Sequence, residues 1–157
     1  MRWKLGLVVA VVAAAGVARA QEDRPPGWIA DSRNGCQVWN NFPQEDERIE
    51  WEGPCVDGYA SGKGTLRWYS KDENYETQEG EFRGGKLNGW VFSKDADGTF
   101  EGEFRDNLPN GEGTRRLNDG EVYSGRWRDG CFDQRGRRAF YFTTLEKCGF
   151  PPLGRSI

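Results

Sequence analysis

A glycine-rich outline recurs along the chain, and this repetition constrains the fold more than any other feature. The stretch from Gly53 to Gly64 reads GPCVDGYASGKG, with glycines at intervals of five, four and two, and the stretch from Gly102 to Gly113 reads GEFRDNLPNGEG. The first glycines of four units follow one another at steps of 27, 22 and 23 residues: Gly53, Gly80, Gly102 and Gly125. Such a period indicates stacked hairpin-sized units.

Pairs of turn-forming residues follow each first glycine. Asp-Gly, Gly-Gly and Asp-Asn pairs predict two-residue hairpin turns, because both central residues of such turns need positive φ. The pairs are Asp57-Gly58, Gly84-Gly85, Asp106-Asn107 and Asp129-Gly130, with Asp97-Gly98 and Asp119-Gly120 predicted to form similar turns between units. Residues 70–77 read as a larger polar loop. The turn spacing predicts a meander of roughly eight short antiparallel strands between Ile49 and Thr144.

Alternation along each predicted strand assigns its two faces, since side chains two apart point the same way. Phe100, Gly102 and Phe104 share one face, and the charged residues between them share the other. On the returning strand, Gly111 and Gly113 leave backbone uncovered, so that an aromatic ring of a neighbouring strand can lie across them. Each unit therefore buries its aromatic row only against the next unit.

The pattern Y-x-G-x-[WF]-x-x-G-x-x-x-G-x-G resembles the MORN repeat. Residues 100–113 match it best, residues 51–64 follow, and residues 78–91 and 123–136 match in part. The departures are Cys55, Gln78, Asn107 and the lost glycines of the fourth unit. The matching positions are Trp51, Gly53, Gly58, Gly62, Gly64, Gly80, Phe82, Gly85, Gly89, Phe100, Gly102, Phe104, Gly111, Gly113, Tyr123, Gly125, Trp127 and Gly130.

The resemblance implies an all-β fold, an elongated single-layer antiparallel meander of stacked MORN-type hairpins. It also implies binding of proteins or membranes rather than catalysis. We assign residues 49–136 to the repeat array and residues 21–48 to an N-terminal cap, in which residues 35–39 cover the first unit. Residues 137–157 form a C-terminal cap and tail, with a final strand at residues 139–143. Repeat arrays need such caps to cover their terminal apolar surfaces.

Residues 1–20 have the features of a secretory signal peptide. Arg2 and Lys4 precede an apolar run over residues 5–18, which is short for a membrane span, and Ala18-Arg19-Ala20 is a small-x-small cleavage site. We expect cleavage before Gln21 and a protein that is exported, either periplasmic or secreted.

The four cysteines, Cys36, Cys55, Cys131 and Cys148, all lie after the predicted cleavage site. An even number of cysteines in an exported chain indicates disulfide bonds. Three pairings are open, and proximity in sequence favours Cys36 with Cys55 and Cys131 with Cys148. The chain has no histidine and no C-x-x-C pair, which argues against zinc.

Catalytic arrangements find little support. The absence of histidine excludes Ser-His-Asp and Cys-His sites. Glutamates two apart on one strand face, at 79 and 81 and at 101 and 103, make a carboxylate-based glycan hydrolase the alternative. A thin sheet offers little burial to raise the pKa of an acid, so we interpret these glutamates as a solvated face. We expect that the protein is not an enzyme and that it binds neither a cofactor nor a metal.

Two groups of residues are candidates for binding. Trp68, Tyr69 and Trp90 lie off the strictest motif positions and belong to residue types that anchor interfaces. The arginines Arg126, Arg128, Arg137 and Arg138 form the second group, which suits an acidic partner or the phosphates of anionic lipid headgroups. The prediction is an exported scaffold protein that mediates protein–protein interaction in the cell envelope, and the alternative is peripheral membrane binding.

Charge is distributed unevenly along the chain. Residues 21–112 hold 20 acids and 10 bases, whereas residues 113–157 hold 5 acids and 9 bases. This asymmetry allows head-to-tail self-association as a further alternative. Export and overall acidity argue against nucleic acid as a partner. The protein partner itself cannot be named from the sequence.

Overall fold

The computed structural model describes residues 26–151, in which β-strands are connected by turns and short loops. None of these residues forms a helix long and apolar enough to cross a membrane. The predicted signal peptide, residues 1–20, lies outside the described part. The strands are β1 (Gly27–Ala30), β2 (Gln37–Asn40), β3 (Glu47–Glu52), β4 (Cys55–Val56), β5 (Tyr59–Ala60), β6 (Gly62–Ser70), β7 (Glu73–Arg83), β8 (Lys86–Asp95), β9 (Gly98–Arg105), β10 (Leu108–Leu117), β11 (Val122–Trp127), β12 (Cys131–Gln134) and β13 (Arg137–Phe140).

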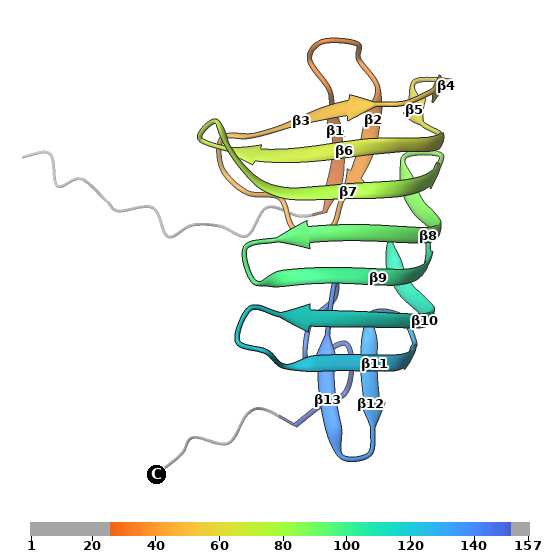
Figure 1. The fold of residues 1–157 in the computed structure, drawn as a ribbon. Coiled ribbons are helices and arrows are strands. Elements are labelled where there is room, and N and C mark those ends of the chain that lie inside the picture. The colour runs from red at the N-terminus through yellow and green to blue at the C-terminus, as the bar shows by residue number, and fades with distance from the viewer. Residues whose placement is uncertain (1–25, 152–157) are drawn as a thin grey trace, which may run out of the picture.

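Seven strands form the main sheet, in the order β11-β10-β9-β8-β7-β6-β3 with antiparallel neighbours, and Figure 1 shows them stacked in chain order. The all-β antiparallel stack is confirmed. The meander holds seven strands rather than roughly eight. The short strands β4 and β5 join β1 and β2 in a second sheet, while β12 and β13 form a third.

Residue pairs with positive φ close the hairpins where the sequence predicts them. The φ angles are 51° and 82° at Asp57-Gly58, 54° and 77° at Gly84-Gly85, 47° and 71° at Asp106-Asn107, and 48° and 82° at Asp129-Gly130. Hydrogen bonds join neighbouring turns at matching positions. They run from the second residue of a turn to the preceding unit, Gly85 N–H to Ala60 O (2.8 Å), Asn107 N–H to Leu87 O (3.0 Å) and Gly130 N–H to Pro109 O (2.9 Å). The turns therefore hold the units in register.

Three predicted turns differ in the structure. Residues 70–77 are not a loop, because β6 and β7 extend to a two-residue turn at Lys71-Asp72, where both φ angles are positive. The Asn74 side chain donates to the Trp68 carbonyl across a bulge, so a polar sequence is accommodated within strands. Asp97-Gly98 and Asp119-Gly120 do not form the two-residue type, since neither aspartate has positive φ.

Aromatic rings cover glycine backbone on the inner face of the main sheet. A Cβ atom on Gly64 would overlap the Trp51 ring, and one on Gly113 would overlap the Phe100 ring. The prediction for Gly111 is wrong, because a Cβ there would meet the Glu103 carboxylate instead of a ring. Gly111 lies in an irregular stretch of the β9–β10 pairing and has a φ of 130°. This backbone conformation, which residues other than glycine rarely adopt, is the reason for a glycine at position 111.

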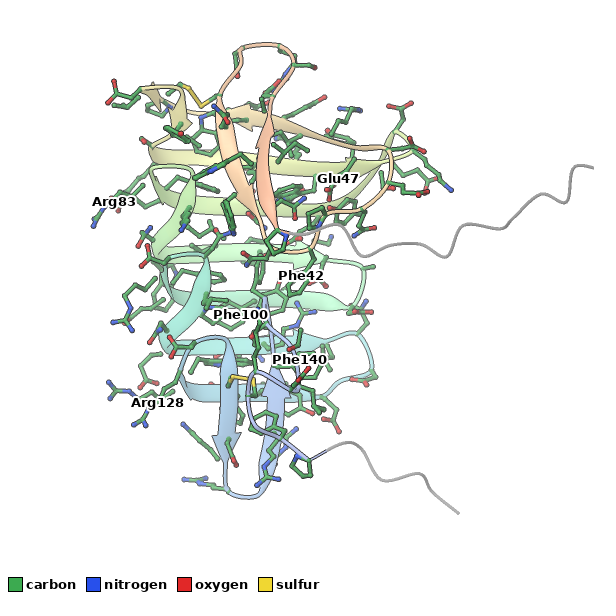
Figure 2. All side chains as sticks on the ribbon, turned by 180° about the vertical axis from the view of Figure 1, so that it is seen from behind. Phe42, Glu47, Arg83, Phe100, Arg128 and Phe140 are labelled. Carbon is green, nitrogen blue, oxygen red and sulfur yellow. A yellow bond between two sulfur atoms is a disulfide. The ribbon has the colours of Figure 1, made fainter. Side chains whose placement is uncertain are left out.

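The two caps cross the inner face of the sheet rather than extend its ends. Figure 2 shows the β1–β2 hairpin lying over the upper strands and the β12–β13 hairpin over the lower ones. Backbone N–H groups of β2 reach the turns, from Gln37 to Gly58 O (2.9 Å) and from Trp39 to Gly85 O (2.8 Å). The β2 strand therefore contacts the turns of the first two units, whereas the sequence predicts that residues 35–39 cover only the first unit.

The predicted final strand at residues 139–143 is only partly formed. β13 ends at Phe140 and pairs with β12, so it does not continue the main sheet. Beyond it, the Tyr141 ring stacks on Phe100 with centroids 5.3 Å apart, and Phe142 packs edge-on against Phe104 at 5.5 Å. These contacts close the aromatic core of the array from the inner side.

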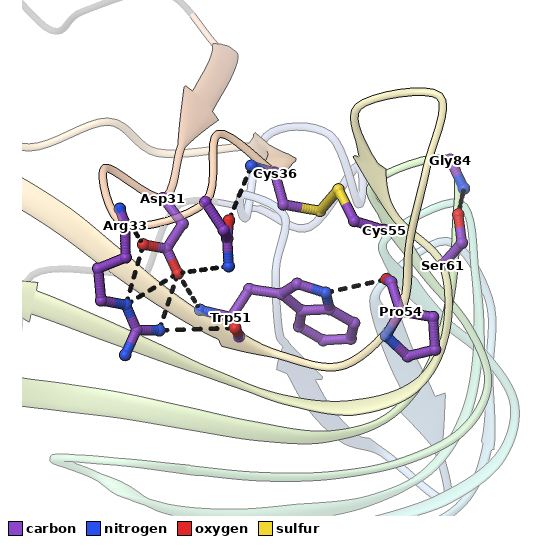
Figure 3. Close-up of a disulfide and its surroundings, with 9 residues drawn as sticks. Asp31, Arg33, Cys36, Trp51, Pro54, Cys55, Ser61 and Gly84 are labelled. Carbon is purple, nitrogen blue, oxygen red and sulfur yellow. Dashed lines mark hydrogen bonds and ion pairs between the residues drawn. A yellow bond between two sulfur atoms is a disulfide. The ribbon is translucent and has the colours of Figure 1, made fainter.

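Disulfides join Cys36 to Cys55 and Cys131 to Cys148, the pairing that proximity favours. Figure 3 shows the first of them beside Asp31, a carboxylate with no solvent exposure. Asp31 accepts hydrogen bonds from the Trp51 backbone N–H (2.7 Å) and from the Arg33 guanidinium (2.8 Å). Burial raises its pKa, but these hydrogen bonds and the Arg33 charge outweigh burial and lower it to about 2. The ionised carboxylate fastens the β1–β2 hairpin to β3.

Candidate functional site on the outer face

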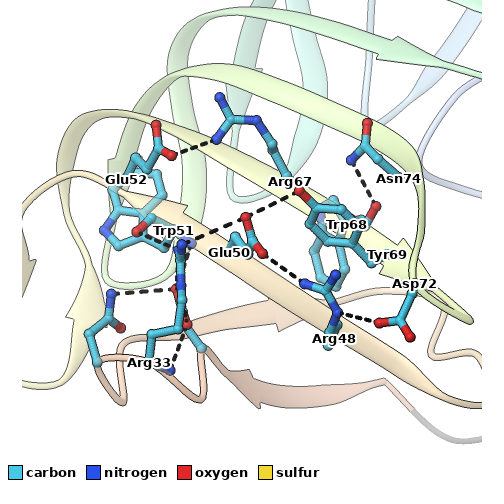
Figure 4. Close-up of polar contacts among 12 residues, drawn as sticks. Arg33, Arg48, Glu50, Trp51, Glu52, Arg67, Trp68, Tyr69, Asp72 and Asn74 are labelled. Carbon is cyan, nitrogen blue, oxygen red and sulfur yellow. Dashed lines mark hydrogen bonds and ion pairs between the residues drawn. The ribbon is translucent and has the colours of Figure 1, made fainter.

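The face of the main sheet opposite the caps, here called the outer face, is covered by ion pairs at its N-terminal end. Figure 4 shows Arg48 bonded to Glu50 (2.8 Å) and Asp72 (3.1 Å), with its guanidinium 3.8 Å above the Tyr69 ring. The Tyr69 hydroxyl donates to Glu50 (3.1 Å). These side chains satisfy one another, so this end of the outer face is a self-contained polar surface.

The middle of the outer face carries two exposed aromatic rings instead. β8 is the central strand of the seven, and its Trp90 and Phe92 side chains are 55% and 39% exposed. Val91 between them is fully buried, as alternation along a strand requires. The other exposed large apolar side chains of the described chain lie outside the main sheet. Exposed apolar patches rimmed by polar residues mark interaction sites on soluble proteins.

Four carboxylates flank these two rings. In the register of the sheet, Phe92 lies between Glu79 on β7 and Glu101 on β9, and Trp90 lies opposite Glu103. Glu81 follows on β7, at an irregularity in the pairing. Within residues 26–151 none of these four glutamates takes part in an ion pair. We call the six residues the aromatic–acidic patch: Trp90, Phe92, Glu79, Glu81, Glu101 and Glu103.

The repeat glycines position two of these carboxylates. A Cβ on Gly111 would collide with the Glu103 carboxylate, and a Cβ on Gly89 would lie 3.5 Å from the Glu81 carboxylate. Both glycines have positive φ, at 130° and 92°. The glutamate before the motif phenylalanine therefore lies over a glycine of the next strand. The same repeat that shapes the sheet also fixes this part of the patch.

The structure separates the three aromatic residues that the sequence grouped as contact candidates. Trp68 is only 5% exposed and belongs to the core, so its assignment as a contact residue is wrong. It points inward because it follows Leu66 by two residues on β6. Tyr69 is engaged with Arg48 and Glu50. Trp90 is the one that presents a free ring on the outer face.

The four arginines do not form one patch. Arg126 and Arg128 are exposed and line a shallow cavity beside Cys131 and Cys148. Arg137 donates to the Val122 carbonyl (2.6 Å) and to Glu121 (3.2 Å), while Arg138 donates to Asp133 (3.1 Å). The charges of Arg137 and Arg138, two of the four arginines, are therefore paired with carboxylates of the same chain.

Phe92 and the four glutamates were not recognised as one site from the sequence. The signal was present in the segment Trp90-Val91-Phe92, because alternation places the two rings on the face opposite the buried valine. The glutamates were assigned to that solvated face correctly, but pairing β7, β8 and β9 was needed to see that they surround the rings.

A buried polar network lies on the inner face. The Tyr141 hydroxyl donates to Asp95 (3.0 Å) and lies 2.9 Å from the Ser93 hydroxyl, and Arg115 pairs with Asp95 (2.8 Å). Ser93 donates to Glu76 (3.0 Å). Burial raises the pKa of Glu76 to about 7, although hydrogen bonds from Gln78 and Ser93 oppose the shift. The network fastens the C-terminal segment to the sheet, next to a cavity of about 740 Å³.

The stacked antiparallel hairpins define an all-β repeat protein. The family model described as MORN repeat matches residues 56–73, 79–89 and 100–122. The chain therefore carries MORN repeats between residues 56 and 122. The match includes neither the degenerate fourth unit from Tyr123 nor the two caps. Comparison with curated proteins gives no match. MORN repeats generally take part in protein or membrane-lipid interaction.

Proposed function

We propose that this chain is an exported MORN-repeat protein that binds a protein partner through the outer face of its main sheet, and that it is not an enzyme. The observation that carries the proposal is the pair of exposed rings, Trp90 and Phe92, at the centre of this face. Aromatic side chains at the centre of a polar surface are the typical anchors of protein interfaces.

Two disulfides support the exported location, because such bonds persist in oxidising compartments. The signal-peptide features of residues 1–20 point the same way. An exported protein with an exposed binding face is suited to act as a scaffold in the cell envelope, and this is the role that we propose. The glutamates of the glycan-hydrolase alternative, Glu79, Glu81, Glu101 and Glu103, are exposed to water, whereas the general acid of such an enzyme lies in an apolar pocket.

Membrane binding through the arginines is the weaker candidate. Arg137 and Arg138 are paired with Glu121 and Asp133, which leaves Arg126 and Arg128 to attract anionic headgroups. Two exposed charges contribute about 1 kcal/mol each at an anionic surface, which is marginal for stable attachment.

A comparative capture experiment tests the proposal. Purified protein is immobilised and exposed to cell-envelope extract as wild type, as Trp90→Ala/Phe92→Ser, and as the matched control Phe42→Ser/Phe140→Ser. The control residues are exposed to a similar extent, 46% and 47%, but lie off the main sheet. We expect a specific protein that wild type and control retain and that the patch variant loses.

The opposite pattern would contradict the proposal. If the patch variant retains every protein that wild type retains, the outer face is not the binding face. A parallel assay with anionic vesicles, comparing wild type with Arg126→Ser/Arg128→Ser, separates the membrane alternative. Vesicle binding that disappears in this arginine variant would favour that alternative.

A further inference from the structure

We propose that the aromatic–acidic patch recognises an extended, basic polypeptide segment with lysine or arginine at alternate positions. This inference rests on the proposed function, because it names the chemistry of the partner that the outer face binds. Four exposed carboxylates that take part in no ion pair within residues 26–151 lie beside the two exposed rings, while the exposed cations Lys63, opposite Glu81, and Lys94, two residues beyond Phe92, lie at the border of the patch. Charge complementarity therefore selects a cationic partner.

The rings and the carboxylates suit the same ligand group. A lysine ammonium or arginine guanidinium binds favourably over the face of a tryptophan or phenylalanine ring, within about 6 Å of its centre. Here each ring has a carboxylate on a neighbouring strand: Glu101 lies opposite Phe92, and Glu103 lies opposite Trp90. A cation above either ring would gain both interactions at once.

The spacing of the patch matches an extended chain. Trp90 and Phe92 are two residues apart on β8, which places them about 7 Å apart along the strand. Side chains on one face of any extended segment repeat at the same interval. A segment lying along β8 would therefore place residues i and i+2 over the two rings. The glutamates of β7 and β9, about 5 Å to either side, would flank both basic groups.

Other occupants fit less well. An anionic lipid surface would be repelled by Glu79, Glu81, Glu101 and Glu103. A neutral glycan could stack on the rings, but it leaves the four charges without partners, and its binding would be insensitive to salt. A second copy packed patch to patch would bring the four glutamates of one chain against those of the other, which like-charge repulsion disfavours.

Fluorescence anisotropy with labelled synthetic peptides tests the inference. One peptide alternates lysine and threonine, and a second has the same composition with the lysines in one block. We expect the alternating peptide to bind more tightly than the block peptide and to weaken as salt rises. Both Trp90→Ala and Glu79→Gln/Glu101→Gln should weaken its binding about tenfold or more.

A matched control separates local recognition from net charge. Glu73→Gln/Glu146→Gln removes two exposed carboxylates elsewhere and changes the net charge equally. We expect this control to bind within about twofold of wild type, since charges beyond a Debye length are largely screened. All substituted side chains are exposed, and thermal midpoints verify that each variant folds.

Three outcomes would overturn the inference: equal binding of both peptides, equal weakening by patch and control variants, or competition by a neutral oligosaccharide. Failure here remains distinguishable from failure of the proposed function. If the alternating peptide does not bind but Trp90→Ala/Phe92→Ser still loses the captured protein, the outer face binds a protein of different chemistry.

Discussion

At the scale of single residues, Glu76 is expected to make the stability of the protein depend on pH. Its pKa is about 7 in the folded protein, against 4.5 ordinarily. Between these values the folded state binds a proton that the unfolded state has lost. Raising the pH through this window therefore lowers the free energy of unfolding, by up to about 3 kcal/mol.

The substitution Glu76→Gln tests this effect. Glutamine keeps an oxygen that accepts from Gln78 and Ser93 but carries no charge to bury. We expect the variant to unfold at a higher urea concentration than wild type at pH 8, and the two to converge near pH 5. Glu73→Gln on the exposed part of the same strand is the control and should follow wild type. Parallel pH profiles of wild type and Glu76→Gln would contradict the assignment.

Asp31 acts in a different pH window and with the opposite sign. Its folded pKa of about 2 lies below the ordinary 3.8, so its contribution to stability is complete above about pH 4 and is lost as the pH falls toward 2. The two carboxylates therefore confine the most stable range to mildly acidic conditions, between the loss of Asp31 and the ionisation of Glu76.

At the scale of elements, the hairpins depend on glycines that lie beneath rings. In Gly113→Ala, the new methyl group would overlap Phe100 and lie 3.3 Å from Trp127. The backbone at Gly113 is not in the left-handed region, so the cost is steric. We expect the free energy of unfolding to fall by about 2 kcal/mol, as measured by urea denaturation.

A double-mutant cycle verifies the cause. Phe100→Leu shortens the ring that the methyl group meets, so the loss in Gly113→Ala/Phe100→Leu should be smaller than the sum of the two single losses. Strict additivity of the two substitutions would show that Phe100 and Gly113 do not share a packing site. It would then remove the reason given for this glycine of the repeat.

The element scale also shows how much the sequence predicts. Turn type follows from local chemistry, so pairs such as Asp57-Gly58 are recognised correctly. Lys71-Asp72 was missed because neither residue favours positive φ strongly, and the turn forms because β6 and β7 continue to pair around it. The crossing caps were not predicted, because their position depends on packing against an inner face assembled from distant strands.

The site was predictable only in part for a similar reason. Trp90 was identified from its residue type, while Trp68, of the same type, is buried. The two tryptophans differ because Trp68 lies on the buried face of β6, together with Leu66, whereas Trp90 lies on the exposed face of β8. The aromatic–acidic patch joins residues of β7, β8 and β9, so it exists only once the register of these strands is known.

At the scale of the whole molecule, the two faces of the main sheet have different roles. The inner face is closed by the β1–β2 and β12–β13 hairpins and by two disulfides (Figure 2). The outer face carries no other segment of the described chain over its centre (Figure 1). A single sheet stabilised from one side can leave its other side available for a partner, as repeat proteins often do.

Site-specific photo-crosslinking in living cells tests this claim most directly. A benzophenone amino acid replaces Phe92 in one strain, and replaces Phe42 or Phe140 in control strains. We predict one discrete protein adduct from position 92 that is absent from both controls and that disappears when Trp90→Ala is added. Adducts from position 42 or 140 with none from position 92 would contradict the assignment of the outer face as the binding surface.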